Sequence, residues 1–331
     1  MSKTTTKVVR IVSTLVLIAV IVLATVFIIK KRKDTITFGT GGTKGMYYQH
    51  VIELEEIEKD KFNIRVRETE GSMANLRLIQ QGYLDVAIVQ NDTLYDAING
   101  YDEYKDKAIG DERSFSAVTY LYTEAVQVVV KKDSGIKSIT DLKDKRVSVG
   151  QEESGVFNNA IDVLSVYGIS LDDITYEHLN FEDSAEALEN GNLDAFFITA
   201  GPPTAAISHL FEEGDTELLS IPEEDVDRLK TINPAYVNVT IPAGTYKGQT
   251  SDVQTLGVYA VLVVSKKLGE DTVYEITKDI FENSAKMNDD IATDGEIKPE
   301  QVPDSMVIPF HKGAAKYYKE KSVDVKVDEA E

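Results

Sequence analysis

The chain has 331 residues, with 35 Lys and Arg against 56 Asp and Glu, so its formal charge at pH 7 is −21. Such acidity argues against a nucleic-acid partner, because phosphate backbones are repelled. The absence of cysteine excludes disulfides and thiolate metal sites, and a hydrophobic content of 42% is that of a folded chain.

An apolar run from Ile11 to Ile29 opens the chain, with basic residues on both sides of it. Nineteen residues are enough to cross a hydrocarbon core. No Ala-x-Ala cleavage site follows the run, so we expect residues 1–33 to be an uncleaved signal-anchor and not a removed signal peptide. Seven of the basic residues lie here, which leaves 28 basic against 56 acidic residues from Asp34 onward.

The next feature is a glycine-rich turn, Gly39 to Gly45, between a short apolar strand and an amphipathic helix expected from about Met46 to Lys59. Glycines allow close backbone approach, and the free N–H groups of the helix point at the same space, so the pattern predicts an anion site. Lys44 stands where a dinucleotide fingerprint needs glycine, and no P-loop pattern is present. A plain tight turn is the alternative.

The order of elements after this turn occurs twice. A strand over 62–68, a helix capped by Ser72 and a strand over 86–89 follow the first helix. About 110 residues later the pattern predicts a strand over 146–149, a helix over 156–167, a strand near Tyr176, a helix over 184–189 and a strand over 195–198. Both halves contain Gly-x-Leu-Asp before the last strand, at Gly82 and at Gly191, which indicates two α/β lobes of one plan.

Two long apolar runs, 124–131 and 256–265, are expected to cross between the lobes. The first lobe would be 34–123 plus 256–331, completed by helices over 273–288 and 314–320, and the second 124–255. The tail from Ser322 onward alternates charges with valine, and we expect it to be frayed. Ligands of open α/β sheets bind outside the carboxyl ends of strands, so two facing lobes predict a cleft.

Polar residues stand at the predicted cleft edges of both lobes. Ser72 with Asn75, and Ser154 with Gly155, lie at helix N-termini, where simple capping is the alternative to ligand binding. Three such N-termini, counting the one after Gly45, would surround a small anion with neutral donors.

Other candidates are less specific. Gln90 and Asp92 follow a buried strand, where a plain turn is the alternative. Tyr47 offers a hydroxyl and a ring, or simply packs on the sheet. The loop from Gly201 to Thr204 brings its backbone near the cleft, or only starts a helix.

Catalysis finds no support in the sequence, and we expect a protein that is not an enzyme. No Gly-x-Ser-x-Gly elbow, metal-binding histidine pair or EF-hand loop occurs. The four histidines have no catalytic context: His50, His178, His209 and His311.

In several motifs the chain resembles the TAXI family of solute-binding proteins of TRAP transporters. The resemblance covers nearly all of residues 35–290 and rests on these stretches: Gly39–Thr43 with Tyr47–Tyr48, Gly71–Leu78, Asp85–Asp92, Val147–Gly155, Asp194–Thr204 and Ile241–Tyr246. It implies a two-lobed type II periplasmic-binding-protein fold with two mixed sheets, outside the cell membrane and held there by the N-terminal helix. No cofactor is implied.

The resemblance also implies a ligand and a partner. The ligand would be a small carboxylate, glutamate, glutamine or a dicarboxylate such as 2-oxoglutarate, delivered to a TRAP permease. Carried over by position, the ligand site would consist of Gly42, Thr43, Tyr47, Ser72, Asn75, Gln90, Asp92, Ser154, Gly155, Gly201, Pro203 and Thr204. The family more often has Ser at Asn91 and Thr at Val156, which leaves the ligand open. A membrane-tethered sensor built on the same two lobes is the alternative function.

Overall fold

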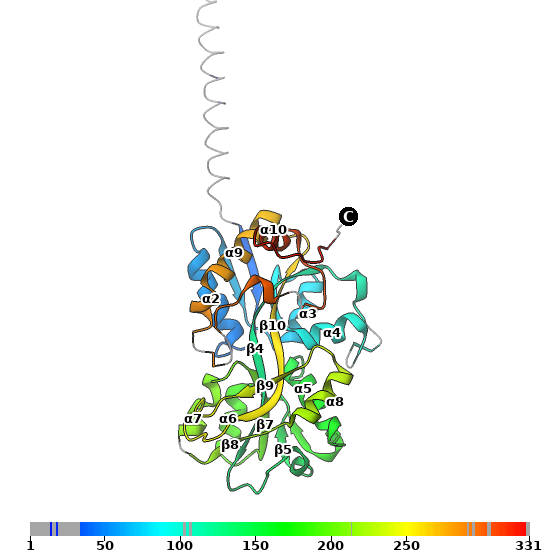
Figure 1. The fold of residues 1–331 in the computed structure, drawn as a ribbon, viewed down its shortest axis with the longest axis vertical. Helices are drawn as coiled ribbons and strands as arrows, with labels where there is room; N and C mark the ends of the chain where they lie inside the picture. Colours follow the sequence, from blue (N-terminus) through cyan, green and yellow to red (C-terminus); the bar gives the residue numbers. More distant parts are fainter. Residues whose placement is uncertain are drawn as a thin grey trace, which may run out of the picture.

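The computed structural model describes residues 34–328 apart from 102–103, 106–107, 213, 290, 293–294 and 303–305, together with Thr14 and Ile18. The expected anchor, residues 1–33, therefore lies outside the described residues except for these two. Among the residues that are described, no helix is both long and apolar enough to cross a bilayer. From residue 34 onward the chain folds into two α/β lobes, one above the other in Figure 1.

The first lobe begins with three parallel strands that alternate with helices. The elements are β1 (Thr35–Gly39), α2 (Met46–Glu58), β2 (Asn63–Arg67), α3 (Ser72–Gln80), β3 (Val86–Gln90) and α4 (Asn91–Asn99). The strand order is β2-β1-β3. Two helices from the end of the chain, α9 (Glu270–Met287) and α10 (Lys312–Glu320), pack on this lobe, as predicted.

The second lobe repeats this plan. Its elements are β5 (Arg146–Ser148), α5 (Gly155–Val166), β6 (Thr175–Glu177), α6 (Phe181–Glu189) and β7 (Ala195–Ala200), followed by α7 (Ala205–Glu212), β8 (Thr216–Leu219), α8 (Glu223–Ile232) and β9 (Val237–Ile241). The strand order β6-β5-β7 is again parallel. The predicted duplication is therefore confirmed. Short 3-10 helices lie at Gly110–Glu112, Ile139–Leu142, Leu171–Asp173 and Pro299–Gln301.

The two Gly-x-Leu-Asp tetrapeptides have the same structural role in both lobes. Gly82 and Gly191 turn the chain with φ of 77° and 72°, values that glycine adopts without a steric cost. The Asp85 carboxylate then accepts from Thr37 N at 2.8 Å, and the Asp194 carboxylate from Arg146 N at 2.8 Å. Each aspartate thus fixes its own strand against the first strand of its lobe.

Two long strands connect the lobes. They are β4 (Phe115–Lys131) and β10 (Val253–Ser265), which pair with each other and run through both lobes (Figure 1). In addition, β10 pairs with β3 of the first lobe and with β9 of the second, while β4 pairs with β7 and β8 of the second. The prediction of two crossing segments is confirmed. The expectation of two separate sheets is wrong, because the shared ladder joins all ten strands into one sheet.

The hydrophobic core is divided between the lobes although the sheet is not. One cluster of buried side chains comes from 36–122 and 260–318. Two others come from 125–258, and alternate residues of β7 enter one or the other, so they lie on opposite faces of the second lobe's sheet. The boundaries 34–123 plus 256–331 and 124–255 stay a prediction.

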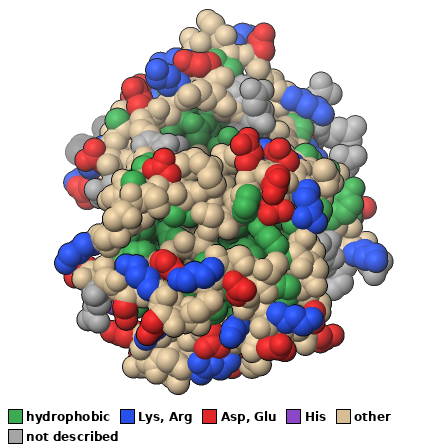
Figure 2. Space-filling model, turned by 60° about the horizontal axis from the view of Figure 1, so that its bottom comes forward, with side chains coloured by type: hydrophobic (Ala, Val, Ile, Leu, Met, Phe, Trp, Pro, Cys, Tyr) green, Lys and Arg blue, Asp and Glu red, His purple; other side chains and the backbone are tan. Residues whose placement is uncertain are grey.

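Lys and Arg lie among Asp and Glu on the face in Figure 2, so the acidic surplus forms no single patch there.

The tail is not frayed as far as Asp328, and that expectation is wrong. Phe310 N donates to Lys326 O and Asp328 N to Phe310 O, each at 2.8 Å. The Asp328 carboxylate meets the Arg113 guanidinium at 3.0 Å, the Ser116 hydroxyl at 2.8 Å and Lys266 at 3.2 Å. A buried ion-pair cluster therefore ties the tail to the first lobe, which the alternating sequence does not indicate.

Candidate functional site

A cavity lies between the two lobes, against the point where β4 passes from one to the other. Its space, including the part of the mouth that is open to solvent, is about 650 Å³. The residues that line it are Gly41, Gly42, Gly45, Met46, Tyr47, Glu70, Gly71, Ser72, Gln90 and Glu124, with Gln151, Ser154, Gly155, Val156, Leu179, Asn180, Phe181, Glu182, Thr199 and Ala200.

Four helix N-termini meet at this cavity. The first residues of α2, α3, α5 and α6 all line it, and each lobe supplies two of them. Free backbone N–H groups and the positive end of the helix dipole favour a negative group at such a point. The sequence predicted three of these N-termini. The fourth was missed because α6 begins at Phe181, capped by Asn180, and not at Ser184.

The two predicted serines play different parts. Ser154 caps α5, with its Oγ accepting from Phe157 N at 3.2 Å. Ser72 is not a cap, and that prediction is wrong: Gly71 takes the cap position with φ of 129°, a conformation that suits glycine. The Ser72 hydroxyl instead accepts from Gln90 N at 3.0 Å, which joins the start of α3 to the end of β3.

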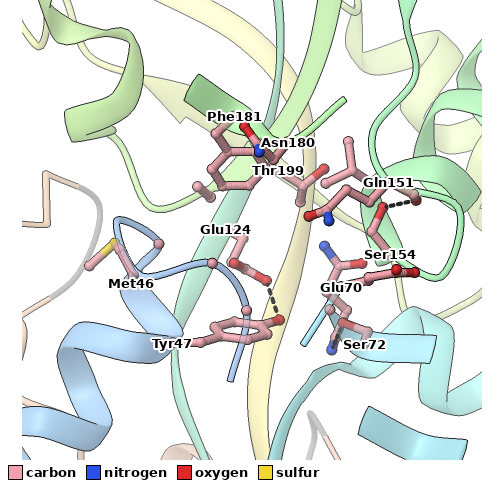
Figure 3. A pocket seen from close by; sticks show the side chains of 18 of the residues that line it. Met46, Tyr47, Glu70, Ser72, Glu124, Gln151, Ser154, Asn180, Phe181 and Thr199 are labelled. Carbon is pink, nitrogen blue, oxygen red and sulfur yellow. Dashed lines mark hydrogen bonds between the residues drawn. The ribbon is translucent and has the colours of Figure 1, made fainter. Parts of the chain in front are cut away.

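Glu124 and Tyr47 form a buried pair at the centre of the cavity (Figure 3). The Tyr47 hydroxyl donates to the Glu124 carboxyl at 3.0 Å, and Glu124 is only 3% exposed. Burial raises the pKa of Glu124 to about 8, although hydrogen bonds from Tyr47, Gln90 and Tyr122 act in the opposite direction. Burial and the Glu124 charge raise the pKa of Tyr47, so its hydroxyl remains a neutral donor.

The ionisable carboxyl groups of the cavity wall have no basic counterpart among the residues that line it. Glu70, Glu124 and Glu182 line it, whereas none of the described residues around it is Lys, Arg or His. A ligand anion would therefore be held by backbone N–H groups and neutral side chains. Gln151 and Thr199, from the second lobe, face Glu124 and Ser72 across the space (Figure 3).

The lobes touch on both sides of the cavity, so the structure is a closed form. On one side Ala74 N donates to Glu153 O at 3.1 Å and Arg77 Nε to the Glu153 carboxylate at 2.8 Å. On the other, Ala292 N donates to Pro202 O at 2.8 Å. At the back, Asn159 of α5 donates to the Asp92 carboxylate.

The structure brings only part of the predicted site together. Six predicted residues line the cavity: Gly42, Tyr47, Ser72, Gln90, Ser154 and Gly155. The other six do not: Thr43, Asn75, Asp92, Gly201, Pro203 and Thr204. Which of these residues contact a ligand stays a prediction.

Those outside the cavity have other contacts. Asn75 is fully buried and donates to Thr40 O and Ile88 O at 2.8 Å, so it fixes the glycine loop from behind. Thr43 is exposed. Thr204 accepts from Gln127 at 2.9 Å within the second lobe, and with Pro203 lines a wider neighbouring cavity that shares Met46 and Glu182 with the first.

Sequence reasoning missed Glu124, the buried one of the three glutamates that line the cavity. Glu124 lies inside an apolar run, at the start of the segment predicted to cross between lobes. A lone acidic residue in such a run indicates a functional position, because unpaired acids are almost never buried. Glu70 directly precedes Gly71, and Gln151 lies in the loop before Ser154, so both stood beside predicted positions. Phe181 and Thr199 carried no such signal.

Comparison with known proteins shows the class of the chain. A structure from Bordetella bronchiseptica RB50 matches with a TM-score of 0.54 at 14% identity, over 90% of this chain and 85% of that one. An ancestral arginine-binding protein bound to arginine matches with a TM-score of 0.48 at 16% identity, over 78% and 99%. The alkanesulfonate-binding protein of Xanthomonas axonopodis pv. citri bound to MOPS matches with a TM-score of 0.46 at 17% identity, over 88% and 92%. Residues 38–322 match the NMT1-like family, so the chain belongs to this family of periplasmic solute-binding proteins.

Proposed function

We propose that this chain is an extracytoplasmic solute receptor that binds a small carboxylate between its lobes and delivers it to a TRAP-type permease. Glutamate, glutamine and dicarboxylates such as 2-oxoglutarate are the candidate ligands, and the TAXI resemblance is the source of this list. The apolar run within residues 1–33 would hold the receptor at the outer face of the cell membrane.

The observation that carries the proposal is the cavity with two helix N-termini from each lobe. A ligand that touches both lobes stabilises the closed form more than the open one, and that difference drives closure. The wall offers neutral donors at short range, while charge on the protein surface is screened beyond about 8–10 Å at physiological salt. A negative protein can therefore bind a small anion.

Calorimetric titration of the full-length chain in detergent micelles tests the proposal. The panel contains glutamate, glutamine, 2-oxoglutarate and further pairs of amino acids and 2-oxo acids. We expect at least one to bind, and at 100 times its dissociation constant to add about 2.7 kcal/mol to the free energy of unfolding. Urea unfolding can be followed by tyrosine fluorescence, because the chain has 16 Tyr and no Trp. A panel without a single binder would refute the receptor proposal.

Delivery needs a separate test. The receptor is reconstituted with a TRAP-type permease in proteoliposomes, and uptake of the bound solute is measured. Uptake should require the receptor and an ion gradient. Uptake at the same rate without the receptor would contradict the proposed partner.

A further inference from the structure

The cavity has two chemically different regions. Helix N-termini from both lobes surround one part of it and suit a negative group. Glu124, in the middle of the cavity, supplies a carboxyl group in a wall without a basic side chain among the described residues. A ligand with carboxylates alone would use the first region and offer no positive group to the Glu124 carboxyl.

We propose that the ligand is an α-amino acid, whose ammonium group binds Glu124 while its carboxylate lies at the helix N-termini. This inference rests on the proposed function and narrows it, because it selects amino acids over dicarboxylates and 2-oxo acids. Glu124 is then the residue that determines ligand class.

The position of Glu124 supports this role over a purely structural one. Val258 pairs with Glu124, and the next residue, Ala125, is the first in β4 to pair with β7. Glu124 therefore lies where the two lobes meet and where a bound ligand is shielded from water. The Coulomb attraction between opposite charges is stronger there than at a surface.

The groups around Glu124 also fit an ammonium. Its hydrogen-bond partners are Tyr47 on α2, Gln90 on β3 and Tyr122 on β4, all of them neutral. A buried carboxyl that served only to bind these neutral donors would gain little from its charge, since burial of an unpaired charge is costly. The other ionisable residues of the described cavity wall, Glu70 and Glu182, are also acidic, which favours a cation over a second anion there.

The test compares ligands that differ only at the amine. The full-length chain in detergent is titrated at pH 8 with three pairs of one carbon skeleton each: glutamate and 2-oxoglutarate, alanine and pyruvate, leucine and 4-methyl-2-oxopentanoate. For at least one pair the amino acid should bind at least about 10-fold more tightly, the effect expected of one charged hydrogen bond.

Glu124→Gln keeps the shape and removes the charge. It should weaken amino-acid binding by about 10- to 100-fold and change 2-oxo-acid binding by less than about 3-fold. Glu58→Gln is the matched control, because Glu58 is fully buried and burial raises its pKa to about 8, yet it lies outside the cavity. The control should leave both affinities unchanged.

Other results would overturn the inference. Tighter binding of the 2-oxo acids by the wild type would show that Glu124 does not favour an amine and instead donates a hydrogen bond to a carboxylate. The receptor proposal would stand in that case. Equal weakening of both classes by Glu124→Gln would show a structural role. Binding of neither class by the wild type would refute the receptor proposal as well.

Discussion

Gly155 offers a direct test of whether this closed form is the ligand-bound one. It is the first residue of α5, and its φ is not in the left-handed region, so alanine fits the backbone. In the closed form, however, an added Cβ would lie 1.6 Å from Gln90 Oε1 and 3.0 Å from Thr93 Oγ1, both in the first lobe. Gln90 is 3% exposed and cannot move aside freely.

The cost of Gly155→Ala therefore falls on closure and not on folding. Overpacking of a buried contact costs about 1–3 kcal/mol, which corresponds to a loss of about 5- to 150-fold in ligand affinity. An open form would move these atoms of the first lobe away from α5, so we expect no loss of stability without ligand. Calorimetric titration with the tightest binder of the panel measures the first effect, and urea unfolding measures the second.

Gly295→Ala is the control, because an added Cβ there has no neighbour within 4 Å among the described residues and the position is far from Gln90 in the chain. It should change neither affinity nor stability. If Gly155→Ala bound ligand within about 2-fold of the wild type, the close approach of α5 to Gln90 would not belong to the bound state. The reasoning about closure would then be wrong.

Three further predictions concern stability and its dependence on pH. Asp85→Ala and Asp194→Ala should each lower the free energy of unfolding by about 1–2 kcal/mol, because each leaves a strand N–H without its carboxylate partner. Urea unfolding measures this effect. A loss of stability for only one of the two variants would contradict the shared role. Asp328→Ala should cost about 1–3 kcal/mol by breaking the contacts with Arg113, Ser116 and Lys266. Burial raises the pKa of Asp328, but the Ser116 hydroxyl and the Lys266 and Arg113 charges outweigh burial and lower the pKa. The stabilisation by Asp328 should therefore be present above about pH 4 and lost at lower pH. Equal effects of Asp328→Ala at pH 3 and pH 7 would contradict this. The pH dependence of stability should have the opposite sign for Glu124, because its folded pKa of about 8 exceeds the unfolded value of about 4.3. Its contribution to the free energy of unfolding should be greatest below about pH 4 and be lost as the pH rises to about 8. Glu124→Gln should flatten that part of the pH–stability curve in urea unfolding at pH 5 and 8.5, and an unchanged slope would refute the assignment.

Much of the fold could be predicted from local pattern. The helix at Met46, the two Gly-x-Leu-Asp turns and the crossing runs each depend on residues close together in the chain, where hydrophobic period, turn glycines and caps are informative. The hydrogen bonds of the two aspartates explain why the repeated tetrapeptide indicated a repeated lobe. Features that depend on distant partners were not predictable. Asp328 becomes ordered only through Arg113 and Lys266, which lie far from it in the chain.

The site was predicted less well than the fold, for a physical reason. Local pattern identifies residues near helix N-termini, and Gly42, Ser154 and Gly155 do line the cavity. It does not say which polar residues turn away, and Asn75 fixes backbone carbonyls behind the loop. Nor does it say which residue of a long strand faces the cleft. Glu124 reaches the cavity because β4 changes partner there, which only the sheet register reveals.

The route of the chain has a mechanical consequence. β1 begins the first lobe, and α10 and the tail to Asp328 end in it, whereas the second lobe is inserted between β4 and β10 (Figure 1). A tether joined at either end of this described chain would hold the first lobe still. The second lobe would then move on the two antiparallel strands β4 and β10, and ligand capture would appear as movement of that lobe alone. A transporter that senses occupancy would gain most by touching it.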